Sequence, residues 1–566
     1  MANPMRVLIV GGVACGPKAA SRLKRLMPSC DVTMIDRGKV ISYGACGLPY
    51  YVEGSFPEVG MLVETPAGVP RNPAFFQKVK GFRTLTGTEA IRLDREKGTV
   101  RVRNLDSGAE EDLPFDRLVL ATGSRPVRPP IPGLDLENVW YMRHLDDAES
   151  LVARIEAEGL KRAVLIGAGY IGVEMAEALR RRGLEVVMVE VFDQIMPQFL
   201  DREMALLAAK HMKQKGVEIV LGERVLSVEG KVKVSSVKTD KRDIPADLVL
   251  VGVGVRPNDE LAREAGIQCA PRGGIVIDEY CRTSDPRIYA GGDCVVNPYV
   301  DSSLKEPFFV PLGSTSNKHG RVIADHIAGK ASRPFKGITS TGICRAFDFT
   351  IGRTGLSEKQ ARELDPDVES SLWAGPDMPH YIPQSKPLIV KMTASRSSRK
   401  LLGVQVVGMG DGSKRLDAAA SAIYFGATVD DIGNIDLGYA PPFAPPIDPL
   451  ATAAHVLANK LDGIGRGLSS LAVKERLDRG DDLILLDVRT PIEFKAMRLP
   501  YENVLHIPLG ALREKAAELP RDKDIIAFCK VSMRGYEAQL ILNAAGFDKV
   551  WFLEGGIVAW PFEVIA

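Results

Sequence analysis

The sequence lacks the features that would direct a protein into a membrane or onto a polyanion. No run of 18 or more apolar residues occurs, so we expect no membrane-spanning helix. The N-terminal segment is too short and too poor in charge to form a secretory signal, and we therefore expect a cytoplasmic protein. The net charge is only +1, which gives no bulk attraction for nucleic acid. We expect neither nucleic acid nor a membrane as a partner.

Metal-binding cysteine patterns are also missing. The eight cysteines are scattered, with no CxxC pair and no Cys/His cluster at the spacing of a metal site, so we expect no bound metal. In a reducing compartment most of them should be free thiols that pack as small hydrophobic residues. Cys46 and Cys529 are exceptions, because each lies in a segment that suggests sulfur chemistry.

The chain of 566 residues is too long for a single hydrophobic core. Hydrophobic residues make up 45% and charged residues 26%, which is the balance of a globular protein. We therefore expect several domains.

Two segments have the order strand, glycine-rich turn, helix, strand and acidic residue. In the first, Arg6–Val10 precedes the turn GGVACG, and residues 32–35 precede Asp36. Glycines let the backbone approach a pyrophosphate at the helix N-terminus, and the acidic residue accepts hydrogen bonds from ribose hydroxyls. The predicted cofactor ligands of this segment are Gly11, Gly12, Ala14, Gly16, Asp36, Arg37 and Ser42.

The pattern returns in Arg162–Ile166, the turn GAGYIG, residues 186–189 and Glu190. Two such units predict two dinucleotides, of which FAD with a nicotinamide is the natural pair. A carboxylate at Glu190 would bond the 2′-hydroxyl of NADH and repel the 2′-phosphate of NADPH, so we expect NADH. The predicted ligands of this segment are Gly167, Gly169, Gly172, Glu190 and Gly254.

Two further segments carry a family resemblance. Residues 118–121 lead into Thr122 and Gly123, and the sequence IYAGGD ends at Asp293. These segments resemble the second and third flavin motifs of the pyridine nucleotide–disulfide oxidoreductases. The resemblance implies that FAD occupies the first unit and that Asp293 bonds the ribityl chain of the flavin.

Cys46 lies in the segment SYGACGLPY, where the chain passes the flavin in this family. Members similar to glutathione reductase have two cysteines there, whereas Cys46 has no neighbour. The segment resembles the coenzyme A–disulfide reductase branch, although Ala45 stands where that branch usually has asparagine. The resemblance implies that electrons pass from NADH through FAD to a sulfur on Cys46. We expect positive potential near the flavin to lower the pKa of this thiol.

The resemblance extends to a dimer and to coenzyme A. The family's C-terminal acid–base histidine is missing, and GYAPPF, with Tyr439, resembles the segment that replaces it in coenzyme A–disulfide reductases. Tyr439 and Tyr381 are therefore candidates for reaching Cys46 across a homodimer. Arg22 and Arg71 are candidates for binding the phosphates of coenzyme A.

The C-terminal hundred residues contain three motifs of a different kind. Strand Leu483–Asp487 enters DVR, residues 525–528 enter CKVSMR, and Val550–Leu553 enters EGGIVAW. A short loop that closes onto a helix N-terminus forms an anion-binding nest, which would stabilise a thiolate or persulfide at Cys529. The three motifs resemble a rhodanese domain. Besides Cys529, the predicted site residues are Lys530 and Arg534, with Asp487 and Arg489 as a brace.

These motifs predict an α/β protein with two Rossmann-like dinucleotide-binding domains for FAD and NAD, an α/β dimerisation domain and a C-terminal rhodanese-like α/β domain. Residues 462–467, DGIGRG, predict a flexible linker before the last domain. The expected boundaries are 1–150 and 246–330 for FAD, 151–245 for NAD, 335–455 for dimerisation and 465–566 for the rhodanese-like domain.

The combination implies an oxidoreductase that uses NADH and FAD to reduce persulfides or polysulfides, coenzyme A persulfide included, with release of sulfide. Cys529 would carry sulfane sulfur to or from Cys46. Three alternatives stay open: a coenzyme A–disulfide reductase with a peripheral rhodanese domain, an NADH oxidase that forms a sulfenic acid on Cys46, and a non-catalytic sulfur relay or redox sensor. The sequence leaves the physiological sulfur substrate open.

Overall fold

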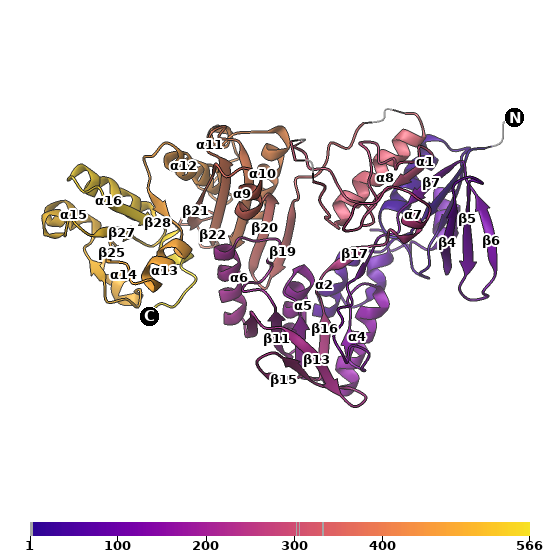
Figure 1. The fold of residues 1–566 in the computed structure, drawn as a ribbon, viewed down its shortest axis with the longest axis horizontal. Helices are drawn as coiled ribbons and strands as arrows, with labels where there is room; N and C mark the ends of the chain where they lie inside the picture. The colour runs from indigo at the N-terminus through magenta and orange to yellow at the C-terminus, as the bar shows by residue number, and fades with distance from the viewer. Residues whose placement is uncertain (1–3, 302, 305, 331–332, 566) are drawn as a thin grey trace. The chain divides into compact units, whose positions relative to one another are not determined.

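The computed structural model describes residues 4–301, 303–304, 306–330 and 333–565. The chain forms two compact α/β units (Figure 1). The first holds the chain up to Val191 together with Glu223–Ile338, and the second holds Phe192–Gly222 and the chain from Thr339 onward. Among the described residues, no helix is long and apolar enough to cross a membrane. Within the same residues, no group of three or more His, Cys, Asp or Glu side chains is placed to hold a metal ion.

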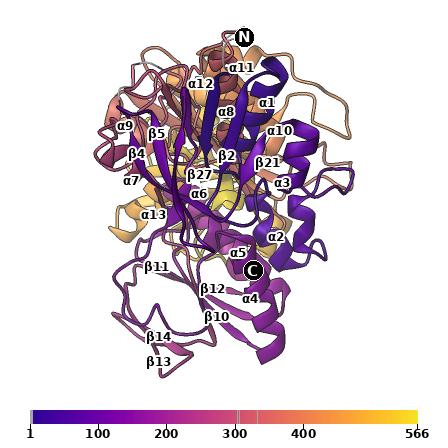
Figure 2. The same ribbon diagram turned by 90° about the vertical axis from the view of Figure 1, so that its right-hand side faces the viewer.

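The first unit contains a five-stranded parallel sheet of order β18-β7-β1-β2-β3, which carries the first glycine-rich turn. Helices α1 (Cys15–Leu26) and α8 (Gly313–Ile327) pack side by side on the face that buries Val7 and Ile9, while Leu8 and Val10 belong to the core of the other face (Figure 2). Burial on both faces explains the continuous apolar strands. The strands are β1 (Arg6–Val10), β2 (Asp31–Ile35), β3 (Arg83–Leu85), β7 (Arg117–Leu120) and β18 (Ile288–Ala290).

A second parallel sheet in this unit carries the second glycine-rich turn. Strands β11, β10, β16 and β9 lie next to one another in that order. Helix α5 (Tyr170–Arg181) follows the turn, and α4 (Leu145–Glu158) precedes β10. The strands are β9 (Val139–Trp140), β10 (Arg162–Ile166), β11 (Glu185–Glu190) and β16 (Leu248–Val251).

The other elements of the first unit are small sheets and short helices. The antiparallel strands are β4 (Thr88–Asp94), β5 (Thr99–Asn104), β6 (Glu110–Pro114), β8 (Ser124–Pro126), β13 (Val225–Gly230), β14 (Val234–Thr239), β15 (Asp243–Pro245) and β17 (Val255–Pro257). The helices are η1 (Ala45–Gly47), α2 (Leu48–Glu53), η2 (Val59–Val63), α3 (Pro73–Phe75), η3 (Phe76–Lys80) and α7 (Glu260–Glu264).

The second unit is built on a five-stranded antiparallel sheet of order β19-β20-β23-β22-β21. Helix α6 (Arg202–Gln214) packs against β20 and β23 of this sheet. The strands are β19 (Gly342–Ala346), β20 (Phe349–Gly355), β21 (Val368–Pro376), β22 (Pro387–Ser395) and β23 (Leu401–Gly408). The further elements are β12 (Val217–Leu221), α9 (Glu358–Leu364), α10 (Ser413–Phe425), α11 (Val429–Asn434) and α12 (Pro449–Leu461).

A buried lysine explains why residues 192–222, which the sequence places in the NAD-binding domain, group with the second unit. Lys391 on β22 is 3% exposed, and its Nζ lies 3.0 Å from Asp201, 2.5 Å from Glu203 and 2.7 Å from Glu358. Asp201 and Glu203 stand at the start of α6. This cluster of charges therefore attaches α6 to the dimerisation sheet.

The C-terminal part of the second unit is a five-stranded parallel sheet of order β24-β28-β27-β25-β26. One face buries Leu486 and Ala527, and the other buries Leu485 and Phe528. The strands are β24 (Gly467–Leu468), β25 (Leu483–Asp487), β26 (Val504–His506), β27 (Asp524–Phe528) and β28 (Val550–Leu553). The helices are α13 (Ser470–Asp478), α14 (Pro491–Ala496), α15 (Leu509–Lys515), η4 (Ala516–Glu518), α16 (Met533–Ala544) and η5 (Gly556–Ala559).

The expectation of a flexible linker at residues 462–467 is wrong. The amides of Ile464 and Gly465 both donate to the Asn459 carbonyl, and the Arg466 amide donates to Gln539 Oε1 at 2.9 Å. Glycine and a short polar run suggested mobility, but the Asn459 carbonyl of α12 and the Gln539 side chain of α16 hold this backbone in place.

Candidate functional site

The first glycine-rich turn can be made only with glycine at its ends. Gly11 has φ +113°, and a Cβ there would lie 2.0 Å from the Ala121 carbonyl oxygen. A Cβ on Gly16 would lie 1.9 Å from the Gly11 oxygen. The Asp36 carboxylate accepts the Gly12 amide at 2.6 Å and the Gly38 amide at 2.7 Å. Burial raises the pKa of this carboxyl, although the two amides oppose the shift.

The second turn repeats this geometry. Gly167 has φ +99°, and a Cβ there would lie 2.6 Å from the Gly252 oxygen. The Glu190 carboxylate is buried and accepts the Ala168 amide at 2.8 Å. A Cβ on Gly169, the residue before α5, would meet no atom within 4 Å, so the helix N-terminus opens onto free space.

Both turns fit the dinucleotides that the sequence predicts. Each brings a tight glycine turn to a helix N-terminus and fixes an acidic side chain at the end of the second strand, where ribose hydroxyls bind. FAD fits the first turn, because the third flavin motif ends on the same sheet at β18. NADH fits the second.

Asp293 gathers polar groups from three segments of the first unit. Its carboxylate accepts Ser124 Oγ at 3.1 Å and Ser316 Oγ at 3.4 Å, and Arg143 Nη2 lies 3.7 Å away. The sequence analysis found Asp293 but missed Arg143, Ser124 and Ser316. No local pattern marks these three residues, because their role depends on tertiary proximity alone.

The turns after β7 and β16 hold three more of the predicted cofactor ligands. These are Thr122 and Gly123 after β7, and Gly254 after β16. Thr122 donates its hydroxyl to the Asn258 carbonyl at 2.6 Å. Gly123 and Gly254 have φ of +71° and +109°, a conformation that favours glycine.

The Cys46 thiol is exposed and lies in η1, directly before α2. Partial desolvation is the largest influence on this thiol and raises its pKa, Glu174 and Asp293 add to the rise, and Arg143 opposes it. The sequence predicted a lowered pKa for Cys46, whereas the groups of the protein itself raise it. Two carboxylates outweigh one guanidinium near this sulfur.

Glu174 connects the Cys46 turn with the second nucleotide turn. Tyr50 on α2 donates its hydroxyl to Glu174 on α5 at 3.3 Å, and the two helices pack together. Cys46 thus lies between the Asp293 group and the helix that begins at the second turn. Glu174 is a further residue that the sequence analysis missed, since one acid on a helix carries no signal of its own.

A short segment, η2 (Val59–Val63), lies against the Cys46 turn, and we call it the strap. The Gly44 amide donates to the Leu62 carbonyl at 3.0 Å, and a Cβ on Gly47 would lie 2.4 Å from Leu62 Cδ2. The Arg71 guanidinium holds this strap by donating to the carbonyls of Leu62 at 2.9 Å and Val63 at 3.0 Å.

The two arginines proposed for coenzyme A are both engaged by protein groups. Arg71 braces the strap, and Arg22 donates to the carboxylate of Asp325, with Nη2 at 2.9 Å. Binding a phosphate at Arg22 would require this ion pair to rearrange. The sequence could not show this, because Asp325 lies on α8, about 300 positions away.

The remaining predicted residues of the first unit and of the dimerisation domain lie as follows. Arg37 is exposed and stands 3.9 Å from Glu89. Ser42 is buried with φ +55°, and its amide donates to the Gly12 carbonyl at 2.7 Å. Tyr381 and Tyr439 are 61% and 51% exposed, so both are accessible to a second copy of the chain.

Cys529 directly follows β27 and is buried. A Cβ on Gly556 would lie 2.5 Å from the Cys529 carbonyl oxygen, which accepts the Ile557 amide at 3.0 Å. Ser532, directly before α16, has φ +88°, and its hydroxyl accepts the Gly555 amide at 2.8 Å. The turn after β28 therefore holds the loop in the strained shape that an anion nest requires.

Two ion pairs frame this loop. Arg534 pairs with Glu493 through two hydrogen bonds of 2.8 Å. This pairing lowers the pKa of Glu493 from 4.5 to about 2. Arg489 is buried against Asp487, and it also donates to the Met497 carbonyl at 2.6 Å. Lys530 is exposed. The buried pair therefore braces α14; that it also braces the Cys529 loop stays a prediction.

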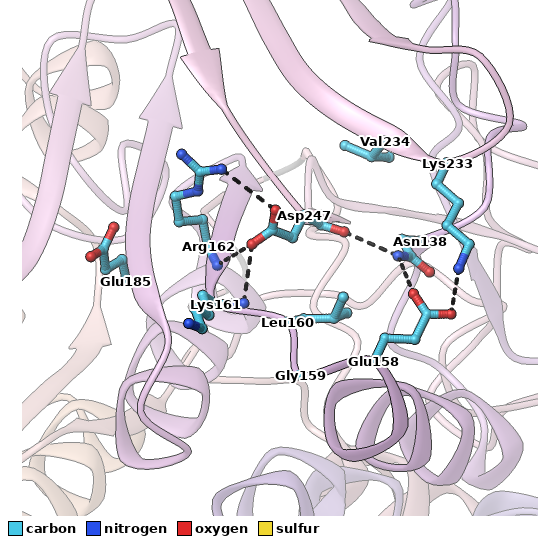
Figure 3. A pocket seen from close by; sticks show the side chains of 10 residues that line it. All are labelled: Asn138, Glu158, Gly159, Leu160, Lys161, Arg162, Glu185, Lys233, Val234 and Asp247. Atoms are coloured by element: carbon cyan, nitrogen blue, oxygen red, sulfur yellow. Dashed lines mark hydrogen bonds and ion pairs between the residues drawn. The ribbon is translucent and has the colours of Figure 1, made fainter.

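A surface hollow of about 600 Å³ lies at the opposite end of the second sheet from its glycine turn (Figure 3). It lies beside Arg162 and Glu185, the first residues of β10 and β11. Four of its charged side chains form ion pairs: Lys233 lies 2.7 Å from Glu158, and Arg162 lies 3.6 Å from Asp247. Because nucleotides bind at the carboxyl ends of parallel strands, this hollow is not the NADH site.

Comparison with known proteins agrees with this geometry. Family models match residues 5–310 (pyridine nucleotide-disulphide oxidoreductase), 343–450 (the dimerisation domain of that family) and 470–562 (rhodanese-like domain). The NAD(P)H sulfur oxidoreductase (CoA-dependent) of Pyrococcus abyssi is 37% identical over 80% of this chain and 98% of its own.

Two solved structures resemble the whole chain. The NAD-dependent persulfide reductase from A. fulgidus has a TM-score of 0.93 and 41% identity, covering 98% of this chain and 100% of its own. Reduced CoADR-RHD from Bacillus anthracis has a TM-score of 0.90 and 32% identity, covering 98% of each chain.

Proposed function

The chain belongs to the pyridine nucleotide-disulphide oxidoreductase family, and we propose that it uses NADH and FAD to reduce the sulfur–sulfur bond of persulfides or polysulfides through Cys46. We include coenzyme A persulfide among these substrates, because one relative is described as a CoA-dependent NAD(P)H sulfur oxidoreductase and another as a coenzyme A polysulfide/persulfide reductase. The observation that carries the proposal is the place of Cys46: an exposed thiol whose charge environment includes both Asp293 of the flavin motif and Glu174 of the helix after the NADH turn.

The chemistry at Cys46 follows from the identity of the attacking group. The Cys46 thiolate attacks a substrate sulfur, so that a new sulfur–sulfur bond to Cys46 forms as the substrate bond breaks and one sulfur leaves as a thiolate or as sulfide. FAD, when bound, supplies the electron pair from NADH that restores the thiolate. Overall, RSSH, NADH and a proton give RSH, H₂S and NAD⁺.

A proton donor must serve the leaving sulfur. Partial desolvation, together with Glu174 and Asp293, raises the pKa of Cys46, so a second group is needed to exchange protons there. We propose Tyr439 of the partner subunit for this role, with Tyr381 beside it in a homodimer. Both side chains are more than half exposed, and they belong to the region that matches the dimerisation domain.

The proposal is tested by mass spectrometry of Cys46 in the purified protein, together with NADH consumption on polysulfide, coenzyme A disulfide and oxygen in parallel. A persulfide or a coenzyme A adduct on Cys46, with fastest turnover on polysulfide, supports it. Fastest turnover on oxygen with a sulfenic acid on Cys46 would identify an oxidase instead. Negligible turnover on all three would indicate a relay.

Replacing Cys529 by serine is expected to separate the two sulfur sites. Reduction of a small persulfide should stay within about twofold of the unmodified protein, because that substrate reaches Cys46 directly. Turnover with a persulfidated protein donor should fall at least about tenfold, since the serine hydroxyl cannot accept sulfane sulfur. Equal losses on both donors, measured as NADH consumption, would contradict a sulfur-carrier role.

Replacing Glu190 by glutamine is expected to weaken the preference for NADH. The amide oxygen still accepts the Ala168 N–H, so the turn is kept, but the charge that repels a 2′-phosphate is lost. The ratio of kcat/KM for NADH over NADPH should fall about tenfold. Glu185→Gln, at the exposed amino end of the same strand, is the matched control and should leave this ratio unchanged.

A further inference from the structure

The Arg534–Glu493 pair stands at the Cys529 site and cancels its own charge. Arg534 Nη1 and Nη2 each donate to one carboxylate oxygen of Glu493 at 2.8 Å, so the two side chains together carry no net charge. Both side chains are 29% exposed, so a sulfur donor that approaches the loop meets them from solvent. Arg534 also interacts with the Cys529 thiol.

Each residue of the pair is preceded in the sequence by an exposed apolar residue. Ile492 precedes Glu493 and is 81% exposed, and Met533 precedes Arg534 and is 58% exposed. Two sulfane donors would respond differently to such surroundings. Thiosulfate is a compact dianion that needs unpaired cations, whereas an alkyl persulfide carries one charge on an apolar stem that can pack on exposed methyl and thioether groups.

We propose that Glu493 makes the Cys529 site selective for organic persulfides over thiosulfate. The inference rests on the proposed sulfur-transfer role of Cys529 and names its substrate class. The Cys529 thiolate attacks the outer sulfur of RSS⁻, forms the Cys529 persulfide and releases RS⁻. With thiosulfate, the same attack would release sulfite. No electrons are exchanged with a third reagent in either reaction, because only the sulfane sulfur moves.

Glu493 also caps helix α14, and this second role allows a variant that removes its charge without removing the cap. Its carboxylate accepts the Thr490 amide at 3.0 Å and the Thr490 hydroxyl at 2.9 Å, while the Glu493 amide donates back to Thr490 Oγ1 at 3.3 Å. This is a capping box at the start of α14, and glutamine serves in such a box as glutamate does. Glu493→Gln therefore keeps the cap and removes only the charge that cancels Arg534.

The test uses the full-length protein and measures persulfidation of the Cys529 peptide by mass spectrometry in single-turnover reactions. The donors are thiosulfate and 2-hydroxyethyl persulfide, whose stem is uncharged. In E493Q, the rate with thiosulfate relative to the persulfide should rise about fivefold, and the rise should shrink as salt is added. NADH-driven reduction of the same persulfide at Cys46 should not change.

Two further variants keep the test decisive. Glu537→Gln removes the same charge from an exposed position on α16 and should leave the donor ratio unchanged. Glu493→Asp keeps the charge and should stay within about twofold of the unmodified protein even if α14 shifts. An unchanged donor ratio in E493Q, or an equal rise in E537Q, would overturn this inference but leave the sulfur-transfer role of Cys529 standing. Failure of the unmodified Cys529 to accept sulfur from either donor would overturn both the inference and the sulfur-transfer role.

Discussion

Replacing Cys46 by serine is expected to lower NADH-driven reduction of polysulfide by about 1,000-fold or more. A serine hydroxyl does not ionise near neutral pH and cannot form a sulfur–sulfur bond, so the whole reaction loses its covalent intermediate. The side chain is exposed and only one atom changes, so the fold and both nucleotide turns should be preserved. The measurement is the steady-state rate of NADH consumption, with FAD content and the unfolding temperature determined on the same preparation.

The matched control is Cys269→Ser, because Cys269 is also partly accessible but lies outside every site described. Its turnover should stay within about twofold of the unmodified protein. Turnover on polysulfide that survives in the Cys46 variant would mean that another thiol or the bound flavin reacts directly. That result would remove the central residue from the proposal, whereas an inactive Cys269 variant would point to general damage.

The sequence was sufficient for the parts of the site that depend on local geometry. Each glycine turn must combine a positive φ, a close backbone contact and a helix N-terminus within six residues, and such demands leave a readable pattern. The acids Asp36 and Glu190 follow from the same unit, because each stands at the end of the second strand and accepts an amide of its turn. The loop at Cys529 could be predicted for the same reason, because its turn and the helix that follows lie close together in the sequence.

Groups that act across the fold left no such pattern. Arg143 and Glu174 set the charge environment of Cys46 in opposite directions, yet each is a single charged residue in its own segment. The protein's own groups raise the pKa of Cys46 where the sequence predicted a lowered one, because desolvation of the thiol and the charges of Glu174 and Asp293 both depend on tertiary structure. Arg22 and Arg71 looked available for phosphates, since their partners are a carboxylate on another helix and two backbone carbonyls.

The linker shows a third kind of limit. Composition suggested mobility at residues 462–467, but the backbone donates to Asn459 and Gln539. Next to it, Lys460 on α12 lies 2.7 Å from the buried Glu554, which also accepts the Leu372 amide of the dimerisation sheet at 3.2 Å. Cys529 is thus held at a fixed place on the second unit. A small diffusible molecule that carries sulfur to and from Cys529 suits a fixed domain better than a mechanism in which the domain itself moves.

Replacing Lys391 by methionine is expected to destabilise the second unit by about 3–5 kcal/mol at neutral pH. Methionine fills a similar volume, but the carboxylates of Asp201, Glu203 and Glu358 would then face one another without a cation. Burial opposes the charge of Lys391, yet the three carboxylates outweigh it and raise its pKa. The free energy of opening, obtained from amide hydrogen exchange in β22, measures the loss.

The loss should depend on pH with a definite sign. Burial acts to raise the pKa of Glu358, but Lys391, with smaller contributions from Ser370 and Arg362, lowers it from 4.5 to about 2. A carboxyl whose pKa is depressed in the folded state stabilises that state above its unfolded value and loses this effect as the pH falls toward the folded value. The difference between the two proteins should therefore be greatest above pH 5 and shrink between about pH 5 and pH 2.

Lys359→Met is the matched control, since it removes an exposed lysine from the same helix as Glu358. It should change the free energy of opening by no more than about 0.5 kcal/mol at any pH. If the Lys391 variant were as stable as this control at pH 7, the ion cluster would contribute nothing net, and packing of α6 on β20 and β23 would have to account for its attachment. Because that cluster joins α6 to β22 of the sheet and to Glu358 of α9, its loss should increase exchange in α6 and β22 together.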